Sequence, residues 1–148
     1  MKIEARRIPE PVLELCRILT GRGFRSWIVG GCIRDLLMGR PVSDWDLATS
    51  ALPHEVERAF PRTFPTGIEH GTITVLHRGE RYEVTTLRGD GTYSDGRRPD
   101  RVELGVSIEE DLARRDFTVN AIAFDPLTEE AVDPWGGILD LGARLIRA

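Results

Sequence analysis

The spacing of apolar residues in the first sixty positions predicts helices that alternate with short strands. Residues 12–20 place four apolar side chains on one helical face, at Val12, Leu15, Cys16 and Leu19. Glycines after this segment are expected to end the helix, and the apolar run 27–29 predicts a short buried strand. A second helix over 32–39, a second strand over 44–49 and a third helix over 53–60, with proline in its first turn, are expected to follow.

Alternating apolar and polar residues in the second half of the chain predict two hairpins. Segments 71–77 and 81–88 carry this alternation and are joined by the short connection RGE, which favours a first hairpin. Segments 116–125 and 129–137 flank a turn and predict a second hairpin. The second prediction is the weaker one, because 118–124 also fits a helix.

The segments around these hairpins predict a loop and a further helix. Residues 89–100 are rich in glycine, aspartate and arginine, which is typical of a mobile loop. Ser107 and Glu110 form a capping-box pattern in front of a helix expected over 109–116. The final segment, 139–148, has a half-helical pattern without a closing cap, so we expect the chain to stop within a longer protein.

Composition narrows the class of protein without identifying a function. The chain has 148 residues, 41% hydrophobic and 30% charged, which is typical of one globular domain. No apolar run approaches the ~20 residues that a membrane-spanning helix needs, and the N-terminus lacks the pattern of a secretory signal. The net charge of −4 argues against strong nonspecific binding to nucleic acid. Cys16 and Cys32 match no zinc spacing or disulfide framework, so we expect a reducing cytoplasm.

The strongest chemical signal lies in the stretch 30–49, GGCIRDLLMGRPVSDWDLAT. Gly30 and Gly31 lie between a predicted strand and a predicted helix, where a backbone without side chains can approach a ligand closely. Free N–H groups at the start of that helix would attract a phosphate. Arg34, one turn into the helix, can reach back to such a phosphate as a charged fork.

Asp44 and Asp46 add a second feature to the same stretch. They stand two residues apart on the predicted strand, so both carboxylates are expected on one face. Adjacent carboxylates repel each other unless a cation lies between them, and hard oxygen ligands suit Mg²⁺. Each feature alone has a simpler explanation, because a glycine pair is commonly only a turn and such aspartates are commonly solvated. Their occurrence together, in this order, favours a phosphate and metal site.

The same stretch resembles the signature of the polymerase-beta-like nucleotidyltransferase superfamily. The branch it resembles contains the bacterial-type tRNA nucleotidyltransferases (CCA-adding enzymes) and the bacterial poly(A) polymerases. Further blocks resemble that branch in the same order, namely TFPTGIEHGTITV, YEVTTLR, YSDGRRPD, EEDLARRDFTVNAIAFDP and VDPWGG. Together the blocks cover nearly the whole chain from Trp27 onward.

The resemblance implies a catalytic role for three carboxylates. Asp44 and Asp46 would hold two Mg²⁺ ions, and Glu83 in the YEVTT block matches a third carboxylate on a neighbouring strand. The alternation of residues agrees, since Arg81, Glu83 and Thr85 share one face of their predicted strand. Without the resemblance, Glu83 would be interpreted as an exposed strand residue.

The block RRDFTVNA implies the nucleotide site. Arg115 would face the triphosphate or the sugar, Asp116 would accept a hydrogen bond from ribose hydroxyls, and Asn120 would support that geometry. Without the resemblance, two arginines at the end of a helix would simply complement its dipole. The expected nucleotide-binding residues are thus Gly30, Gly31, Arg34, Arg115, Asp116 and Asn120.

Some other positions are weaker candidates. The loop 89–100 resembles the flexible loop of enzymes that add the terminal A, where Arg97 and Arg98 would contact the nucleotide, although a solvated loop fits equally well. His70, beside a glycine, is a candidate for a place near the site. The tryptophans, at positions 27, 45 and 135, are expected to be packed or half-buried rather than to stack on bases.

Taken as a whole, the resemblance implies an α+β domain with a mixed, mostly antiparallel sheet of about five strands and helices on one face. Residues 1–148 would form a nucleotidyltransferase head, and the neck, body and tail of the family would be absent from the chain. The implied reaction is Mg²⁺-dependent transfer of a nucleotide from CTP or ATP to the 3′ end of tRNA. Two alternatives stay open, the head of a poly(A) polymerase and a non-catalytic nucleotide-binding module.

Overall fold

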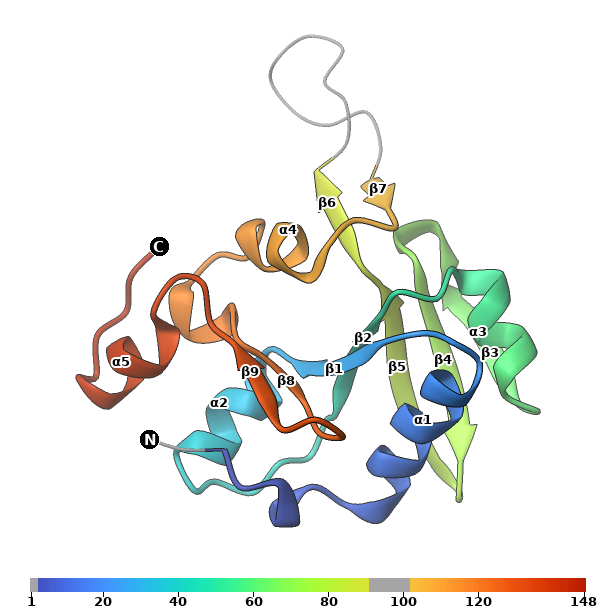
Figure 1. Ribbon diagram of the computed structural model, residues 1–148, viewed down its shortest axis with the longest axis horizontal. Coiled ribbons are helices and arrows are strands. Elements are labelled where there is room, and N and C mark those ends of the chain that lie inside the picture. The colour runs from blue at the N-terminus through green and yellow to red at the C-terminus, as the bar shows by residue number, and fades with distance from the viewer. Residues whose placement is uncertain (1–2, 91–101) are drawn as a thin grey trace, which may run out of the picture.

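The computed structural model describes residues 3–90 and 102–148 and is built on a seven-stranded mixed sheet (Figure 1). The strands lie in the order β3-β4-β5-β2-β1-β8-β9. Their bounds are β1 (Ser26–Val29), β2 (Asp46–Thr49), β3 (Thr63–Gly67), β4 (Thr72–His77), β5 (Glu80–Thr86), β8 (Ala123–Asp125) and β9 (Glu130–Val132). A separate two-stranded ladder pairs β6 (Arg88–Asp90) with β7 (Val102–Leu104).

The α+β class is confirmed, but the sequence-based number of about five strands is wrong. The strand that the sequence did not predict is β3, whose residues TFPTG lack an apolar–polar alternation. Pro65 is tolerated within β3 because this strand lies at the edge of the sheet, where one side of the backbone has no partner strand. The weaker of the two predicted hairpins is confirmed, with β8 and β9 shorter than expected.

Helices cover both faces of the sheet rather than the single face expected. They are α1 (Glu10–Gly21), α2 (Gly31–Leu37), α3 (Pro53–Ala59), α4 (Ile108–Ala113) and α5 (Gly137–Gly142), with short 3₁₀ turns η1 (Ala5–Arg7), η2 (Ile68–His70) and η3 (Thr118–Asn120). The larger core joins α1, α2 and α3 to inward residues of the strands, such as Ile28 and Val84. A smaller core joins α4 to Trp27 and Val29. Since successive residues of β1 point to opposite faces and all are buried, both faces need a cover.

The pairing of the central strands fixes which residues meet. Each strand of the large sheet pairs antiparallel with its neighbours except β2 and β5, which run parallel. In this parallel pair Asp46 lies opposite Glu83, and on the next strand Thr74 lies opposite Glu83. Residues far apart in the sequence are therefore neighbours across three adjacent strands.

Two element boundaries near the predicted site differ from the sequence-based expectation. Strand β2 begins at Asp46, so Asp44 lies in the irregular segment before it. Helix α4 ends at Ala113, so Arg115 follows the helix instead of closing it. Residues 91–100 of the predicted loop, with Arg97 and Arg98, lie outside the described residues. In the described part of the chain, no helix has the length and apolar character needed to cross a membrane.

Candidate functional site

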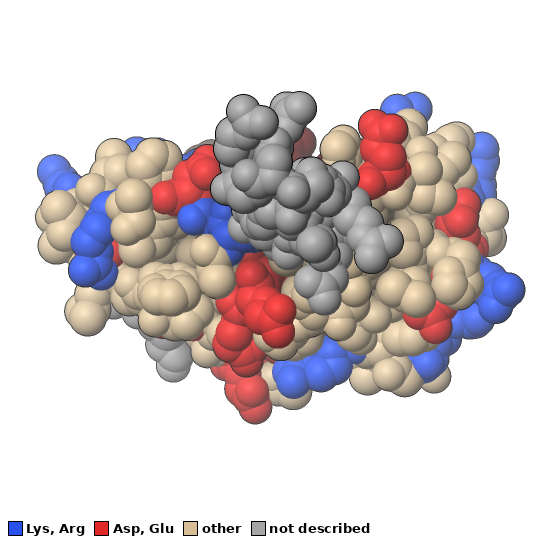
Figure 2. All heavy atoms as spheres, turned by 90° about the horizontal axis from the view of Figure 1, so that it is seen from above, with Lys and Arg blue, Asp and Glu red and all other residues tan. Residues whose placement is uncertain are grey.

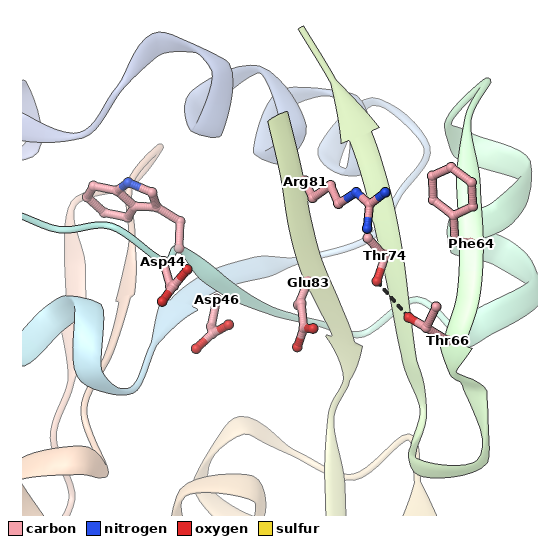
Figure 3. A pocket seen from close by; sticks show the side chains of 8 residues that line it. Asp44, Asp46, Phe64, Thr66, Thr74, Arg81 and Glu83 are labelled. Atoms are coloured by element: carbon pink, nitrogen blue, oxygen red, sulfur yellow. Dashed lines mark hydrogen bonds between the residues drawn. The ribbon is translucent and has the colours of Figure 1, made fainter. Parts of the chain in front are cut away.

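A cavity of about 780 Å³ opens beside the central strands (Figure 3). Strand β5 contributes Arg81 and Glu83, and Thr74 comes from the adjacent β4. Asp46 enters from the start of β2, and Asp44 comes from the segment just before that strand. Trp45, Phe64 and Thr66 complete the lining. The three carboxylates predicted to act together thus line one cavity (Figure 3).

The register of β2 and β5 explains why Asp46 and Glu83 meet. They are directly opposite each other in the parallel pair, on the face that the larger core does not cover. Burial raises the pKa of Asp46, and the negative charges of Glu83 and Asp44 raise it further, while Arg115 acts in the opposite direction. The arrangement therefore concentrates negative charge that a cation would stabilise.

The donor chemistry of this cavity fits a hard divalent cation, since carboxylate oxygens are the ligands that Mg²⁺ prefers. In the described residues, no group of three or more histidine, cysteine, aspartate and glutamate side chains is arranged tightly enough to hold a metal ion. The three carboxylates share a cavity without converging on one point. Binding of a cation by all three carboxylates would require these side chains to move closer together.

Gly30 allows the sharp turn between β1 and α2. Its φ of 78° lies in the region that favours glycine, and its carbonyl accepts hydrogen bonds from the N–H groups of Ile33 and Arg34. A Cβ atom built on Gly31 would lie 3.2 Å from Nη2 of Arg34, so glycine there leaves room for the guanidinium. The two glycines therefore shape the turn and admit Arg34 beside it.

A second cavity of about 390 Å³ collects the predicted nucleotide-binding residues. Its lining consists of Gly30, Gly31, Arg34, Asp46, Arg88, Arg114, Arg115, Asp116 and Asn120. Within it, Nη1 of Arg34 donates to Oδ1 of Asn120 at 3.2 Å, which links α2 to η3. Asp46 lines both cavities and connects the carboxylate group to the arginine-rich group.

One face of the molecule carries a group of acidic side chains near its middle. Figure 2 shows this group in the face seen from above, with basic side chains on both sides of it and further acidic side chains towards the right. A cation would be attracted to the central group.

Several residues near the site were missed by sequence reasoning. Arg88 and Arg114 line the second cavity, and Arg81 stacks its guanidinium over the ring of Phe64 at 5.6 Å beside the first. Arg81 had been placed on the same face as Glu83, but its position in a cavity could not be inferred from alternation alone. Arg88 stands at the end of a predicted strand, which is a common place for an exposed arginine.

The weaker candidates have mixed outcomes. The side chain of His70 is 63% exposed and lines none of the cavities described here, although its carbonyl oxygen accepts a hydrogen bond from Nη1 of Arg88. Trp27 is buried and Trp45 is half-buried, as expected. Trp135 is 50% exposed, more than the expected packing position would allow.

The sequence of this chain is similar to a known family model and to curated proteins. A model of the poly A polymerase head domain matches residues 26–147. The CCA-adding enzyme of Geobacillus thermodenitrificans is 51% identical over 138 residues, which is 93% of this chain and 34% of that enzyme. The CCA-adding enzyme of Geobacillus kaustophilus is 52% identical over 137 residues, again 93% of this chain and 34% of the relative. The chain thus spans about one third of the length of these curated relatives.

Solved structures show the same likeness. The crystal structure of the Bacillus stearothermophilus CCA-adding enzyme in complex with CTP superposes with a TM-score of 0.83 and 45% identity, covering 94% of this chain and 33% of the other. The crystal structure of a tRNA nucleotidyltransferase complexed with a primer tRNA and an incoming ATP analog gives a TM-score of 0.69 and 30% identity. That second match covers 90% of this chain and 38% of the other.

Proposed function

The chain belongs to the family of the poly A polymerase head domain, and from this premise we propose that it is the catalytic head of a CCA-adding tRNA nucleotidyltransferase. The reaction is attack of the tRNA 3′-hydroxyl on the α-phosphate of CTP or ATP. The bond between the α- and β-phosphates breaks, and pyrophosphate leaves. We propose that this reaction takes place in the cytoplasm.

One observation carries the proposal. Asp46 is opposite Glu83 in the first cavity, and it also lines the second cavity with Arg34 and Arg115. The carboxylates that would bind a metal ion therefore lie next to the arginines that would bind a triphosphate. Phosphoryl transfer relies mainly on positioning the reactants and on neutralising the charge of the phosphates. Adjacent carboxylates and arginines are suited to both tasks.

The family resemblance, together with a place in the second cavity, supports a proposed role for each nucleotide-binding residue. The guanidinium groups of Arg34 and Arg115 would bind phosphate oxygens through charge-assisted hydrogen bonds. The carboxylate of Asp116 would accept hydrogen bonds from ribose hydroxyls, and Asn120 would hold Arg34 through the hydrogen bond already described. Gly30 and Gly31 would let the phosphates approach the backbone.

Members of this group of nucleotidyltransferases generally depend on a metal ion. We propose that Asp44, Asp46 and Glu83 hold two Mg²⁺ ions, because their donor oxygens suit that ion. When bound, such ions lower the pKa of the attacking hydroxyl and neutralise the departing pyrophosphate. The side chains of this chain supply the ligands and the negative field that attracts the ions.

The head of a poly(A) polymerase is the second candidate, because the matched family model carries that name. The named relatives at about half identity are CCA-adding enzymes, which favours the tRNA reaction. Selection between CTP and ATP, and binding of tRNA, would depend on the parts of the relatives that this chain does not span. We expect the chain by itself to bind triphosphates weakly and with little base selectivity.

Calorimetric titration of the chain with CTP and with ATP in the presence of Mg²⁺ tests the proposal. We expect binding that is lost in Glu83→Gln and in Asp46→Ala, with the circular dichroism spectrum unchanged. Glu130→Gln is the matched control, since Glu130 is an exposed strand glutamate on β9, at the far edge of the sheet. Equal affinity in Glu83→Gln and the unaltered chain would contradict the metal assignment.

A transfer assay separates the two candidate functions. The chain is joined to the remaining two thirds of a CCA-adding relative and incubated with labelled CTP or ATP and a tRNA that lacks its 3′ end. Addition of C and A to the tRNA supports the CCA-adding reaction, whereas long A tails on an unrelated RNA support a poly(A) polymerase. The absence of transfer, despite nucleotide binding, would favour a non-catalytic module.

A further inference from the structure

Asp111 is a charged residue in the interior that the proposed reaction does not yet use. It lies on α4, is 1% exposed, and precedes Leu112 of the smaller core. Burying a carboxylate is costly unless hydrogen bonds or an opposite charge compensate it. The partners of this carboxylate therefore show what it stabilises.

The first partner is Arg115, four residues further along the chain. Its Nη2 donates to Oδ1 of Asp111 at 3.1 Å. Within residues 3–90 and 102–148, Asp111 is the only group that hydrogen-bonds to the side chain of Arg115, and Nε of Arg115 is buried without a partner. The direction of this guanidinium thus depends on a single carboxylate.

The second partner fixes the carboxylate itself. Oδ2 of Asp111 accepts a hydrogen bond from the backbone N–H of Arg88, the first residue of β6, at 2.9 Å. Arg88 is held in turn, because its Nη1 donates to the carbonyl of His70 at 2.8 Å and its own carbonyl accepts from Nε of Arg114 at 3.1 Å. Asp111 is therefore anchored to the backbone of a strand and presents one oxygen to Arg115.

The free arm of Arg115 reaches the glycine turn. A Cβ atom built on Gly30 would lie 3.6 Å from Nη1 of Arg115, so this nitrogen lies beside the turn between β1 and α2. Nη2 donates to Asp111, and Arg115 lines the cavity that Arg34 and Asp116 also line. A fixed guanidinium at this point binds an anion without first losing its rotational freedom.

We propose that Asp111 is a positioning residue, which holds the guanidinium of Arg115 against the glycine turn so that it receives the phosphates of the nucleoside triphosphate. The inference rests on the proposed function and adds a residue that acts through Arg115 without touching the nucleotide. If Asp111 had only a structural role, it would act through its hydrogen bond with β6, and its substitution would change CTP affinity whether or not Arg115 is present. In the positioning role, the effect of Asp111 on CTP affinity requires Arg115.

A double-mutant cycle measures that dependence. Asp111→Asn has the same shape and keeps one acceptor for the N–H of Arg88, but it loses the charge that holds Arg115. We expect it to weaken binding of CTP with Mg²⁺ about tenfold, the order of effect of a lost charge-assisted hydrogen bond. In an Arg115→Ala background the same substitution is expected to change the affinity less than twofold.

Asp125→Asn is the matched control. Asp125 is another buried aspartate paired with an arginine, Arg25, at 3.1 Å, but neither residue lines the nucleotide cavity. We expect its effect on CTP binding to be less than twofold, while thermal unfolding shifts in both aspartate variants. Equal loss of CTP affinity in Asp111→Asn and Asp125→Asn would assign the effect to stability and overturn the inference.

An NMR experiment decides the question even if Asp111→Asn fails to fold. A guanidinium held by a carboxylate rotates slowly, so the Nη protons of Arg115 should give separate signals at low temperature in the unaltered chain, identified by their loss in Arg115→Lys. One averaged signal would overturn the inference. The outcomes remain distinguishable, because failure of the unaltered chain to bind CTP refutes the proposed function, whereas normal binding by Asp111→Asn refutes only the role of Asp111.

Discussion

At the scale of single residues, the opposition of Asp46 and Glu83 has a cost in stability. Two negative side chains directly opposite each other on adjacent strands repel, and here the charge of Asp44 adds to that repulsion. Burial raises the pKa of Asp46, and the charges of Glu83 and Asp44 raise it further. Under the metal assignment proposed above, the metal-free site is destabilised by this repulsion.

Removing one of these charges should stabilise the metal-free chain. We expect Glu83→Gln to raise the free energy of unfolding by about 0.5 kcal/mol in a buffer with a chelator, by relief of the repulsion with Asp46. Urea titration followed by circular dichroism measures the change, and Glu130→Gln reports the effect of the substitution on a strand far from the site. A lower stability in Glu83→Gln would show that the two carboxylates do not repel in the folded chain.

The same residues show how far the sequence could predict the site. Gly30, Arg34, Asp46 and Asn120 line one cavity, because their motifs lie where β1 ends, where β2 begins and in the adjacent α2 and η3. Asp111 could not be found in this way. It stands in a run of acidic residues at the start of a helix, which is typical of a solvated first turn, and its burial becomes visible only when β6 packs against α4.

At the scale of elements, η3 and α5 form a unit beside the second cavity. Thr118, the first residue of η3, donates from Oγ1 to the buried carboxylate of Asp140 on α5 at 2.5 Å. Oδ2 of Asp140 also accepts from Nε of Arg147 at 3.1 Å. Since η3 carries Asn120, the packing of α5 fixes the residue that holds Arg34. This contact could not be predicted from the sequence, because Thr118 and Asp140 stand 22 residues apart and Asp140 belongs to none of the motifs.

Gly137 tests the contact between these elements. A Cβ atom there would lie 2.0 Å from the carbonyl oxygen of Thr118, which no side chain can accept without movement of the backbone. We expect Gly137→Ala to lower the free energy of unfolding by about 3 kcal/mol. Urea titration measures this loss.

The control for that prediction lies in the same helix. A Cβ atom on Gly142 meets nothing within 4 Å, so Gly142→Ala should leave stability unchanged or raise it by about 0.5 kcal/mol. Similar stabilities of the two alanine variants would contradict the close packing of α5 on η3.

At the scale of the whole molecule, stability in acid should depend on the junction between α1 and the hairpin of β4 and β5. Glu14 on α1 shares a hydrogen bond of 2.7 Å with Nε2 of His77 and forms an ion pair with Arg78. The hydrogen bond with His77 lowers the pKa of Glu14, desolvation partly opposes it, and the charge of Arg78 adds to the lowering. A carboxyl whose pKa is lowered by folding stabilises the folded state where it is ionised in both states.

The contribution of Glu14 should therefore disappear on acidification. Above its ordinary pKa of 4.5 the difference in unfolding free energy between the unaltered chain and Glu14→Gln should be constant, and it should shrink as the pH falls below that value. Urea titrations from pH 3 to pH 7 measure it. A difference that grows as the pH falls would show that folding does not lower the pKa of Glu14.

The position of β1 in the middle of the sheet has a consequence for biosynthesis. One side of β1 pairs with β2, which follows it closely, but the other side pairs with β8, which begins only at residue 123. While the ribosome is still making the intervening segments, the apolar run SWIV presents an unsatisfied backbone edge that can pair with another nascent chain. This edge of β1 is therefore open to such pairing until β8 has been synthesised.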